Sequence, residues 1–220
     1  MKKVLLLLAN GVEPLEMAAF TDVFGWASIL GAETVDLVDV GLRPEIKTTF
    51  GLQLKPRHLL EEVELESFDA LAIPGGFEPS GFYEEALSEP FLEVIRHFSR
   101  AQKPIASVCV SSISLGVAGV LEGKEATTYH QVGGKRKQQL EQTGALFVDR
   151  PLVIDGHCIT STGPGTALEV AFELLRMLTS QSNAEELRQK MRMPEPSAQW
   201  YQTAQVVSEE RRVEHNRERV

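Results

Sequence analysis

Short apolar runs alternate with amphipathic stretches along most of this chain. Residues 4–9 (VLLLLA) contain no polar position, as expected of a strand that is buried on both faces. Residues 16–31 place apolar side chains three or four positions apart, which predicts a helix that ends near Gly31. Residues 34–40 (TVDLVDV) alternate between polar and apolar positions and predict a second strand.

The same alternation continues towards residue 180. Further strands are expected at 69–76, 104–110, 125–130 and, in pieces around turns, within 145–166. Further helices are expected at 90–102, 111–121, 133–144 and 166–180. Strands that alternate with helices in this way predict an α/β fold, a three-layer sandwich with a mainly parallel sheet.

The chain changes character near its C-terminus, where prolines and mixed charges replace the apolar pattern. We therefore expect one α/β domain over residues 1–192, followed by a polar tail over residues 193–220. A polar tail is often a solvated end. The alternative is that it packs on a partner such as a second subunit, through Trp200, Tyr201, Val206 and Val207.

Five segments that follow predicted strands carry the polar and small residues of interest. In a parallel sheet, ligands bind beyond the carboxyl ends of the strands, so these segments should meet at one rim. They are NGVEPLE (10–16), PGGFEPSG (74–81), CVSS (109–112), TYHQ (128–131) and STGPGT (161–166).

Cys109 stands where a predicted strand meets a predicted helix, with Ser107 and Ser111 two positions to either side. A cysteine is most often a small buried hydrophobe, which is the structural interpretation. The functional interpretation is a nucleophile elbow, a tight turn that presents a reactive side chain. Backbone N–H groups at the start of the helix would then favour the thiolate and lower the pKa of the thiol.

Other residues of the same rim extend this hypothesis. Glu16 begins the first helix, where it either complements the helix dipole or, facing a thiolate in a closed pocket, keeps its proton and donates or shuttles it. His130 ends the segment TTYH and is a candidate base. The backbone N–H groups of Gly75, Gly76 and Val110 are candidates for an oxyanion hole. The remaining histidines are expected to be structural or at the surface: His58, His97, His157 and His215.

Composition narrows the possible functions. The formal net charge is −9 and the basic residues are scattered until the far C-terminus, which argues against binding nucleic acid. Two cysteines are too few for a disulfide framework, so we expect a reducing, cytoplasmic setting. The opening MKKVLLLLA is better interpreted as a strand than as a signal peptide, and no run suits a membrane helix. The segment 161–166 lacks the lysine of a phosphate-binding loop, so no nucleotide cofactor is expected. No metal site is expected either.

Taken together, these motifs resemble the ThiJ/PfpI superfamily, which is related to class I glutamine amidotransferases. The resemblance covers residues 2–192 and is carried, in order, by GVEPLE, AIPGG, SVCVSS, TTYH and TSTGPGTALEVA. It implies a flavodoxin-like fold and a homodimer. It also implies that Cys109 is the nucleophile, that Glu16 hydrogen-bonds its sulfur and that His130 lies near the pocket. Gly75, Gly76 and Val110 match the backbone donors.

The chain departs from the branches of this superfamily at several positions. Val110 follows the cysteine where the protease-like branch has histidine, which disfavours peptidase activity. Residues 109–111 read CVS where the deglycase-like branch has C-A-G or C-A-A. Residues 48–51 (TTFG) contain no arginine where the deglycase-like branch often has one. Glu16 stands where the isonitrile-hydrating branch has aspartate.

Three functions remain open at this stage. The first is a cofactor-free enzyme of the glyoxalase or deglycase type, in which Cys109 attacks a small dicarbonyl or its protein adduct. The second is a stress-response or chaperone-like protein in which Cys109 is a redox sensor held as sulfinate by protonated Glu16. The third is an amidase-like hydrolase with a dyad of Cys109 and His130.

Overall fold

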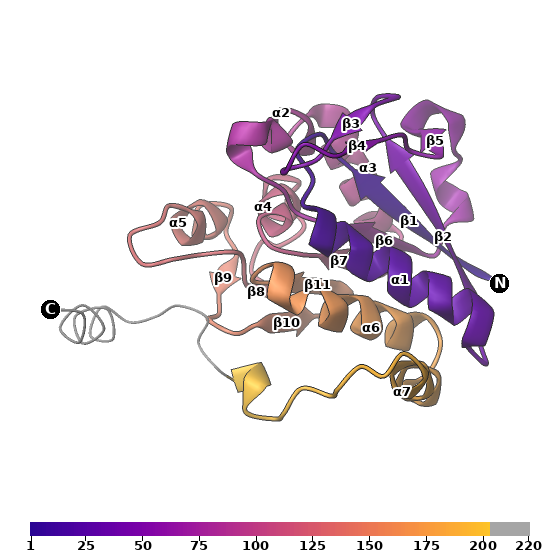
Figure 1. The fold of residues 1–220 in the computed structure, drawn as a ribbon. Coiled ribbons are helices and arrows are strands. Elements are labelled where there is room, and N and C mark those ends of the chain that lie inside the picture. Colours follow the sequence, from indigo (N-terminus) through magenta and orange to yellow (C-terminus); the bar gives the residue numbers. More distant parts are fainter. Residues whose placement is uncertain (203–220) are drawn as a thin grey trace, which may run out of the picture.

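A seven-stranded sheet runs through the computed structural model, which describes residues 1–202 (Figure 1). In spatial order its strands are β10 (Leu152–Asp155), β11 (Cys158–Ser161), β7 (Ile105–Ser107), β6 (Ala70–Ile73), β1 (Lys2–Leu8), β2 (Val35–Gly41) and β5 (His58–Leu59). Every neighbouring pair is parallel except β10 with β11. The order β2-β1-β6-β7-β11 is that of flavodoxin-like folds, so the predicted fold class is confirmed.

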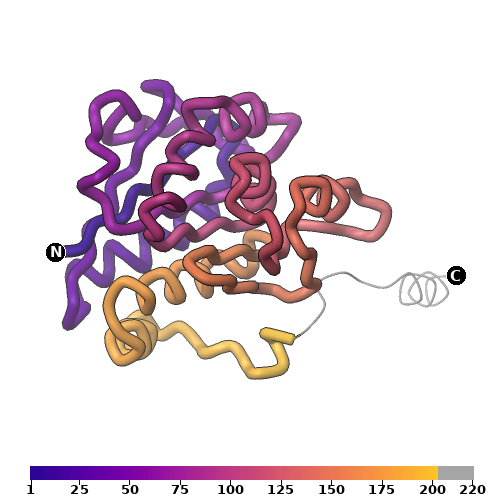
Figure 2. Tube along the Cα trace, turned by 180° about the vertical axis from the view of Figure 1, so that it is seen from behind, coloured from indigo at the N-terminus to yellow at the C-terminus, as the bar shows by residue number. Residues whose placement is uncertain are grey.

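Helices cover both faces of this sheet and complete the three layers. One face carries α1 (Pro14–Leu30), α6 (Ala167–Leu178) and α7 (Gln181–Lys190), which pack on one another (Figure 1). The other face carries α2 (Phe82–Ala86), α3 (Glu89–Arg100) and α4 (Ser111–Val117), seen in front of the sheet in the reversed view of Figure 2. Burial on both faces explains why residues 4–8 of β1 are wholly apolar.

The start of α1 is fixed by its own sequence. Pro14 occupies the first turn, where its missing N–H is not needed, and the Glu13 side chain accepts a 2.8 Å hydrogen bond from the Glu16 N–H. Phe20 and Phe24 bury the inner face of the helix against the core. The cap therefore holds Glu16 at the first turn, directly after β1.

Three predicted elements differ from the structure. In the expected strand 125–130, only β8 (Glu125–Ala126) is a strand, and it pairs with β9 (Leu146–Phe147) in a separate small sheet. The TTYH segment is a loop, and its backbone and hydroxyl groups bond to other segments instead of to a neighbouring strand. The Thr127 N–H donates to Thr160 Oγ1 at 3.0 Å, and Thr128 Oγ1 donates to the Cys109 carbonyl at 3.1 Å. Strand β7 also ends at Ser107 rather than at 110, and the expected strand 69–76 is confined to β6.

The sequence patterns gave no sign of the elements over residues 42–66. Two short strands, β3 (Ile46–Lys47) and β4 (Gln53–Leu54), form a hairpin beside the main sheet. Two-residue strands leave too short a pattern to be recognised. Helix α5 (Arg136–Glu141) is the core of the expected helix 133–144 and protrudes from the body of the molecule (Figure 1). None of the helices in residues 1–202 is long and apolar enough to cross a membrane.

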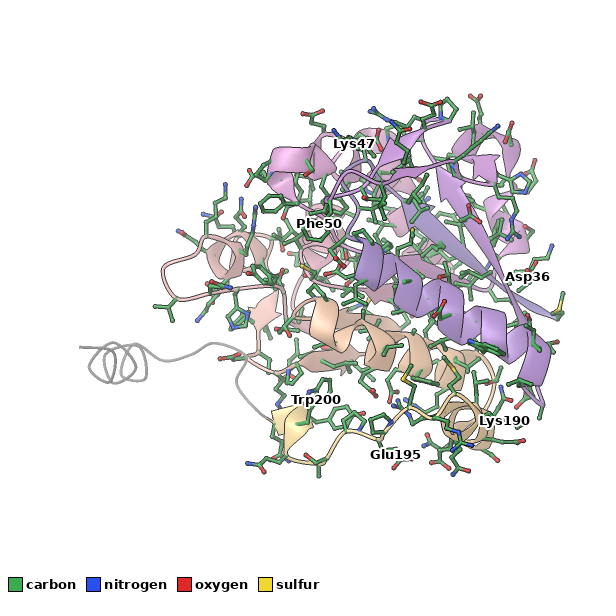
Figure 3. The ribbon with its side chains drawn as sticks, viewed as in Figure 1. Asp36, Lys47, Phe50, Lys190, Glu195 and Trp200 are labelled. Atoms are coloured by element: carbon green, nitrogen blue, oxygen red, sulfur yellow. The ribbon has the colours of Figure 1, made fainter. Side chains whose placement is uncertain are left out.

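The described part of the tail lies against its own chain. Arg188 of α7 forms two hydrogen bonds with Glu169 of α6, at 2.9 and 2.6 Å, and donates a third to the Pro194 carbonyl at 3.0 Å. The Tyr201 hydroxyl lies 3.4 Å from Glu169 Oε2, and the Trp200 ring packs edge-on against the Tyr201 ring. Figure 3 labels Glu195 and Trp200 in this part of the tail. The expected contacts of Val206 and Val207 lie outside the described residues.

Candidate active site

A cavity of about 310 Å³ opens at the carboxyl ends of the sheet strands. Each of the five post-strand segments contributes to its wall, through Glu16, Gly76, Cys109, Tyr129 and Pro164 respectively. The convergence expected from the sequence is therefore confirmed. Its cause is the strand order, because β1 and β6 lie side by side but their chains turn to opposite sides of the sheet, which opens a crevice between them.

Cys109 occupies a strained turn between β7 and α4. Its φ angle is +62°, a left-handed conformation that residues other than glycine rarely adopt. The turn is held on both sides: the Cys109 N–H donates to the Ser161 carbonyl at 3.0 Å, and Ser111 Oγ accepts from the Val108 N–H at 3.0 Å. The side chain is 7% exposed and lines the cavity. This geometry is that of a nucleophile elbow.

Glu16 reaches the thiol from the first turn of α1. Its side chain is fully buried, and Oε2 accepts a 2.6 Å hydrogen bond from the Gly75 N–H. Within residues 1–202, the buried Oε1 atom has no hydrogen-bond partner. Burial raises the pKa of Glu16 from an ordinary 4.5 to about 8, although its interactions with Cys109 and the Gly75 amide lower it. The carboxyl group therefore keeps its proton at neutral pH.

The electrostatics of the thiol differ from the expectation. Burial raises the pKa of the Cys109 thiol well above its ordinary value, and the charge of Glu16 raises it further. The Val110 N–H at the start of α4, a helix of only seven residues, lowers the pKa of Cys109. This lowering is smaller than the increase caused by burial and by Glu16. The predicted effect of the backbone N–H groups is present, but the prediction that the pKa of the thiol is lowered was wrong, because burial beside a carboxyl group outweighs that effect.

The backbone donors divide into two roles. The Gly75 N–H binds Glu16, so it is not free for an oxyanion, which corrects its predicted role. Gly75 must still be glycine, because a Cβ atom there would lie 2.8 Å from Glu16 Oε2 and 2.9 Å from Cys109 Cβ. The N–H of Gly76 has no acceptor within the described residues, and that of Val110 faces the sulfur. Gly76 and Val110 remain the candidate oxyanion donors.

His130 does not join this cavity. Its Nδ1 lies 2.8 Å from the Thr128 carbonyl, its Nε2 lies 3.0 Å from Asp149 Oδ1, and its ring packs edge-on against Phe147. It lines a neighbouring hollow of about 190 Å³, and the preceding residue, Tyr129, faces both spaces. The prediction of a dyad between His130 and Cys109 is corrected accordingly, since both ring nitrogens are engaged elsewhere.

Several wall residues were not found from the sequence. Phe50, labelled in Figure 3, comes from a loop without a recognisable motif, and Phe77 belongs to the PGG segment but was not itself singled out. Arg136 comes from the first position of α5, far along the chain from residues 48–51, where the pocket arginine was sought and not found. No periodicity signals such residues, because they reach the cavity through the path of the loops.

The second cysteine lies away from the cavity. Cys158 is 1% exposed in β11, in agreement with the expectation of a core strand residue, and Lys124 Nζ lies 3.8 Å from its sulfur. Burial raises the pKa of the Cys158 thiol, with Lys124 opposing. Among the described residues, no group of three or more His, Cys, Asp or Glu side chains is placed to hold a metal ion.

An elbow cysteine with a buried carboxyl partner, on a flavodoxin-like sheet, is the arrangement expected of the ThiJ/PfpI superfamily. The DJ-1/PfpI family model matches residues 2–177, and the chain belongs to this family. Protein dj-1beta of Drosophila melanogaster is 30% identical over 188 residues, which cover 84% of this chain and 94% of the relative. Its crystal structure has a TM-score of 0.77 and covers 88% of this chain.

Two further relatives differ in how much of their length is matched. The protein of Schizosaccharomyces pombe named glutathione-independent glyoxalase DJ-1 is 28% identical over 204 residues, which cover 88% of this chain and all of that protein. Protein DJ-1 homolog A of Arabidopsis thaliana is 30% identical over 186 residues, but the match spans only 45% of its length. The chain thus corresponds to less than half of that larger relative.

Proposed function

We propose that this protein is a cysteine-dependent, cofactor-free enzyme that acts on reactive dicarbonyls or on their protein adducts, in the manner of a glyoxalase or deglycase. The observation that carries the proposal is the pair formed by Cys109, on a strained elbow, and buried Glu16 beside it. The name of the S. pombe relative supports the same reaction class. Methylglyoxal, CH₃–CO–CHO, serves as the reference substrate.

The first step forms a carbon–sulfur bond. Glu16 and Cys109 titrate as a coupled pair. Once the pair has lost one proton, the Glu16 carboxylate accepts the remaining proton from the thiol while the sulfur attacks the aldehyde carbon. The aldehyde oxygen becomes an alkoxide that the N–H groups of Gly76 and Val110 stabilise. That oxygen then takes the proton from Glu16, which yields a hemithioacetal and leaves the carboxylate free to act again.

The second step moves hydrogen between the two substrate carbons. The Glu16 carboxylate removes the proton from the carbon bonded to sulfur, and the hydroxyl proton on that carbon passes to the neighbouring ketone oxygen, which gives an enediolate. Glu16 then returns its proton to the neighbouring carbon. The first carbon is thereby oxidised to a thioester and the second is reduced to an alcohol, so no external oxidant is needed. Water then cleaves the thioester, which releases lactate and restores the thiol.

Replacement of the thiol tests this function. The wild-type protein should convert methylglyoxal to lactate. Cys109→Ser should lower kcat/KM by at least about 100-fold, because a serine hydroxyl is a far weaker nucleophile than a cysteine thiol near neutral pH. The matched control is Cys158→Ser, which changes the other buried cysteine. Full turnover by Cys109→Ser would overturn the assignment of the nucleophile.

A redox sensor is the second candidate, and the protonation of Glu16 favours it. A neutral carboxyl group beside sulfur can donate a hydrogen bond to a sulfinate oxygen and so stabilise that oxidation state. Mild peroxide should then add two oxygens to Cys109 while Cys158 stays reduced. A low kcat/KM for methylglyoxal together with this selective oxidation would favour the sensor over the enzyme.

We also propose that the protein forms a homodimer and works in the cytoplasm, in a stress response. Exposed apolar side chains on the outer surface of α1 support a dimer contact, namely those of Leu15, Trp26, Ile29 and Leu30. Two free, buried cysteines suit a reducing compartment. Light scattering tests the oligomer: a monomer mass at micromolar concentration would exclude the dimer.

A further inference from the structure

Glu13 lines the Cys109 cavity at the start of α1 and has no part in the carbon–sulfur and hydrogen-transfer steps. Its backbone N–H donates to the Gly75 carbonyl at 2.9 Å, and its carbonyl accepts from the Met17 N–H at 3.1 Å. Its side-chain Oε2 accepts from the Glu16 N–H at 2.8 Å. These three bonds fix the carboxyl group of Glu13 at the cavity wall, next to the residue that faces the thiol.

The backbone contact also places Glu13 beside a candidate oxyanion donor. The Gly75 carbonyl that binds Glu13 belongs to the same peptide group as the Gly76 N–H, and in a trans peptide these two point in opposite directions. The Gly76 N–H therefore points away from Glu13, and Gly76 also lines the cavity. Burial is the main cause of the raised pKa of Glu16 and of Cys109, and the charge of Glu13 adds to both.

Among the described residues, three carboxyl groups line this cavity, and their surroundings differ. Glu16 is fully buried beside the sulfur and has no surface for a bound water. Glu78 is paired with two cations, Lys135 at 3.0 Å and Arg136 at 2.6 Å. Glu13 is half-buried, makes no ion pair with any described residue, and uses only Oε2 to cap the helix. Its Oε1 atom is thus available to a water molecule.

The thioester step is the one that needs such a group. A water molecule must lose a proton as its oxygen attacks the thioester carbon, and a carboxylate within reach of that water can accept the proton. Glutamate is ordinarily ionised at neutral pH. Because water enters from the open part of the cavity, half-buried Glu13 can meet it, whereas Glu16 is closed to solvent.

We propose that Glu13 is a further catalytic residue of this site, the general base that activates the water that hydrolyses the Cys109 thioester. This inference rests on the proposed function, in which that thioester forms. Glu13 accepts one proton from water as the water oxygen bonds to the thioester carbon, and the N–H groups of Gly76 and Val110 hold the oxyanion. The carbon–sulfur bond then breaks with its electron pair on sulfur, and Glu13 returns the proton to the thiolate. The released acid loses its own proton to solvent.

An acetyl thioester on Cys109 tests this step without a dicarbonyl. p-Nitrophenyl acetate acetylates cysteine, and after the excess reagent is removed, mass spectrometry of the Cys109 peptide follows the loss of the acetyl group. Glu13→Gln should slow this loss about 100-fold, because the amide accepts no proton but keeps an oxygen for the Glu16 N–H. The matched control, Glu84→Gln, changes an exposed glutamate of α2 outside the cavity and should alter the rate less than twofold.

The rate of acetylation separates catalysis from a structural effect. The charge of Glu13 adds to the raised pKa of Cys109, so Glu13→Gln should be acetylated at least as fast as the wild type. Slow loss of the acetyl group after unimpaired acetylation is the expected result. Equal rates of loss in the wild type and Glu13→Gln, an equal fall in Glu84→Gln, or a common slowing of both steps in Glu13→Gln would each overturn the inference.

Turnover of methylglyoxal then distinguishes this inference from the proposed function. If the wild type forms lactate, Glu13→Gln should accumulate a lactoyl thioester on Cys109 that hydroxylamine cleaves, because hydrolysis has become the slow step. If the wild type forms no lactate while acetyl loss depends on Glu13, the proposed function fails and the role of Glu13 in thioester hydrolysis stands. If lactate forms and acetyl loss does not depend on Glu13, the enzyme stands and this inference fails.

Discussion

The Gly75 N–H donates a 2.6 Å hydrogen bond to Oε2 of Glu16, a carboxyl group that is fully buried beside Cys109. This bond joins the loop after β6 to the first turn of α1. It fixes the carboxyl group where a Cβ atom on residue 75 would collide with both partners of the reactive pair. The carboxyl group, the thiol and the glycine therefore form one unit, and the following predictions probe its parts.

Glu16 should make the stability of the folded protein depend on pH. Its folded pKa of about 8 lies above the ordinary 4.5, so the folded state holds this proton more tightly than the unfolded state. The stabilising effect is complete below about pH 4.5 and is lost as the pH rises through 8, at up to about 1.4 kcal/mol per pH unit.

Glu16→Gln should remove this dependence, because the amide keeps the shape and the acceptor for Gly75 but does not ionise. The free energy of unfolding, measured by urea at pH 5 to 9, should therefore decline less steeply in Glu16→Gln than in the wild type. Glu61→Gln changes an exposed glutamate and should leave the slope unaltered. Parallel slopes in wild type and Glu16→Gln would contradict the raised pKa.

The reactivity of Cys109 should increase with pH beyond neutrality. Because burial raises the pKa of both Glu16 and Cys109, the pair loses its first proton near pH 8, which is the pKa of Glu16. The rate of alkylation of Cys109 by iodoacetamide should therefore climb between pH 6 and 9, as followed by mass spectrometry. A rate that is already constant from pH 6 upward would show a thiolate at neutral pH and refute this account.

Gly75→Ala should disturb the fold and the site together. The new Cβ atom would meet Glu16 Oε2, the Val108 carbonyl and Cys109 Cβ, all within 2.9 Å, so the backbone must shift. Overpacking of this kind costs about 1–3 kcal/mol, which urea unfolding can measure. Gly165→Ala is the control on the same rim, because a Cβ atom there meets nothing within 4 Å. Equal stability of the two variants would argue against the close packing around residue 75.

His130→Ala should lower the stability of the fold while leaving the reactivity of Cys109 nearly unchanged. The imidazole contacts Thr128, Asp149 and Phe147, so its loss should lower the free energy of unfolding by about 1–3 kcal/mol. The alkylation rate of Cys109 should change less than about threefold, since His130 lies outside its cavity. A tenfold loss of Cys109 reactivity in a folded His130→Ala protein would restore the dyad that the geometry disfavours.

The sequence by itself determined the layered α/β fold and the rim on which the site lies. Wholly apolar runs such as residues 4–8 must be buried on both faces, and helices with one apolar face must cover them, so local periodicity specifies this architecture. The small residues around Cys109 and the glycines of the PGG segment are likewise local requirements of a tight turn, and they indicate the elbow from the sequence alone.

Only the tertiary structure decided the chemistry of that elbow. Whether a thiol ionises depends on what surrounds it, and burial beside Glu16 outweighs the start of α4. Tyr129 rather than His130 lines the Cys109 cavity because of the path of the loop after β8. Arg136 lines the same cavity because of where α5 protrudes. Such contacts join residues far apart in the chain, and no local pattern records them because their distances and desolvation arise only when the whole fold closes.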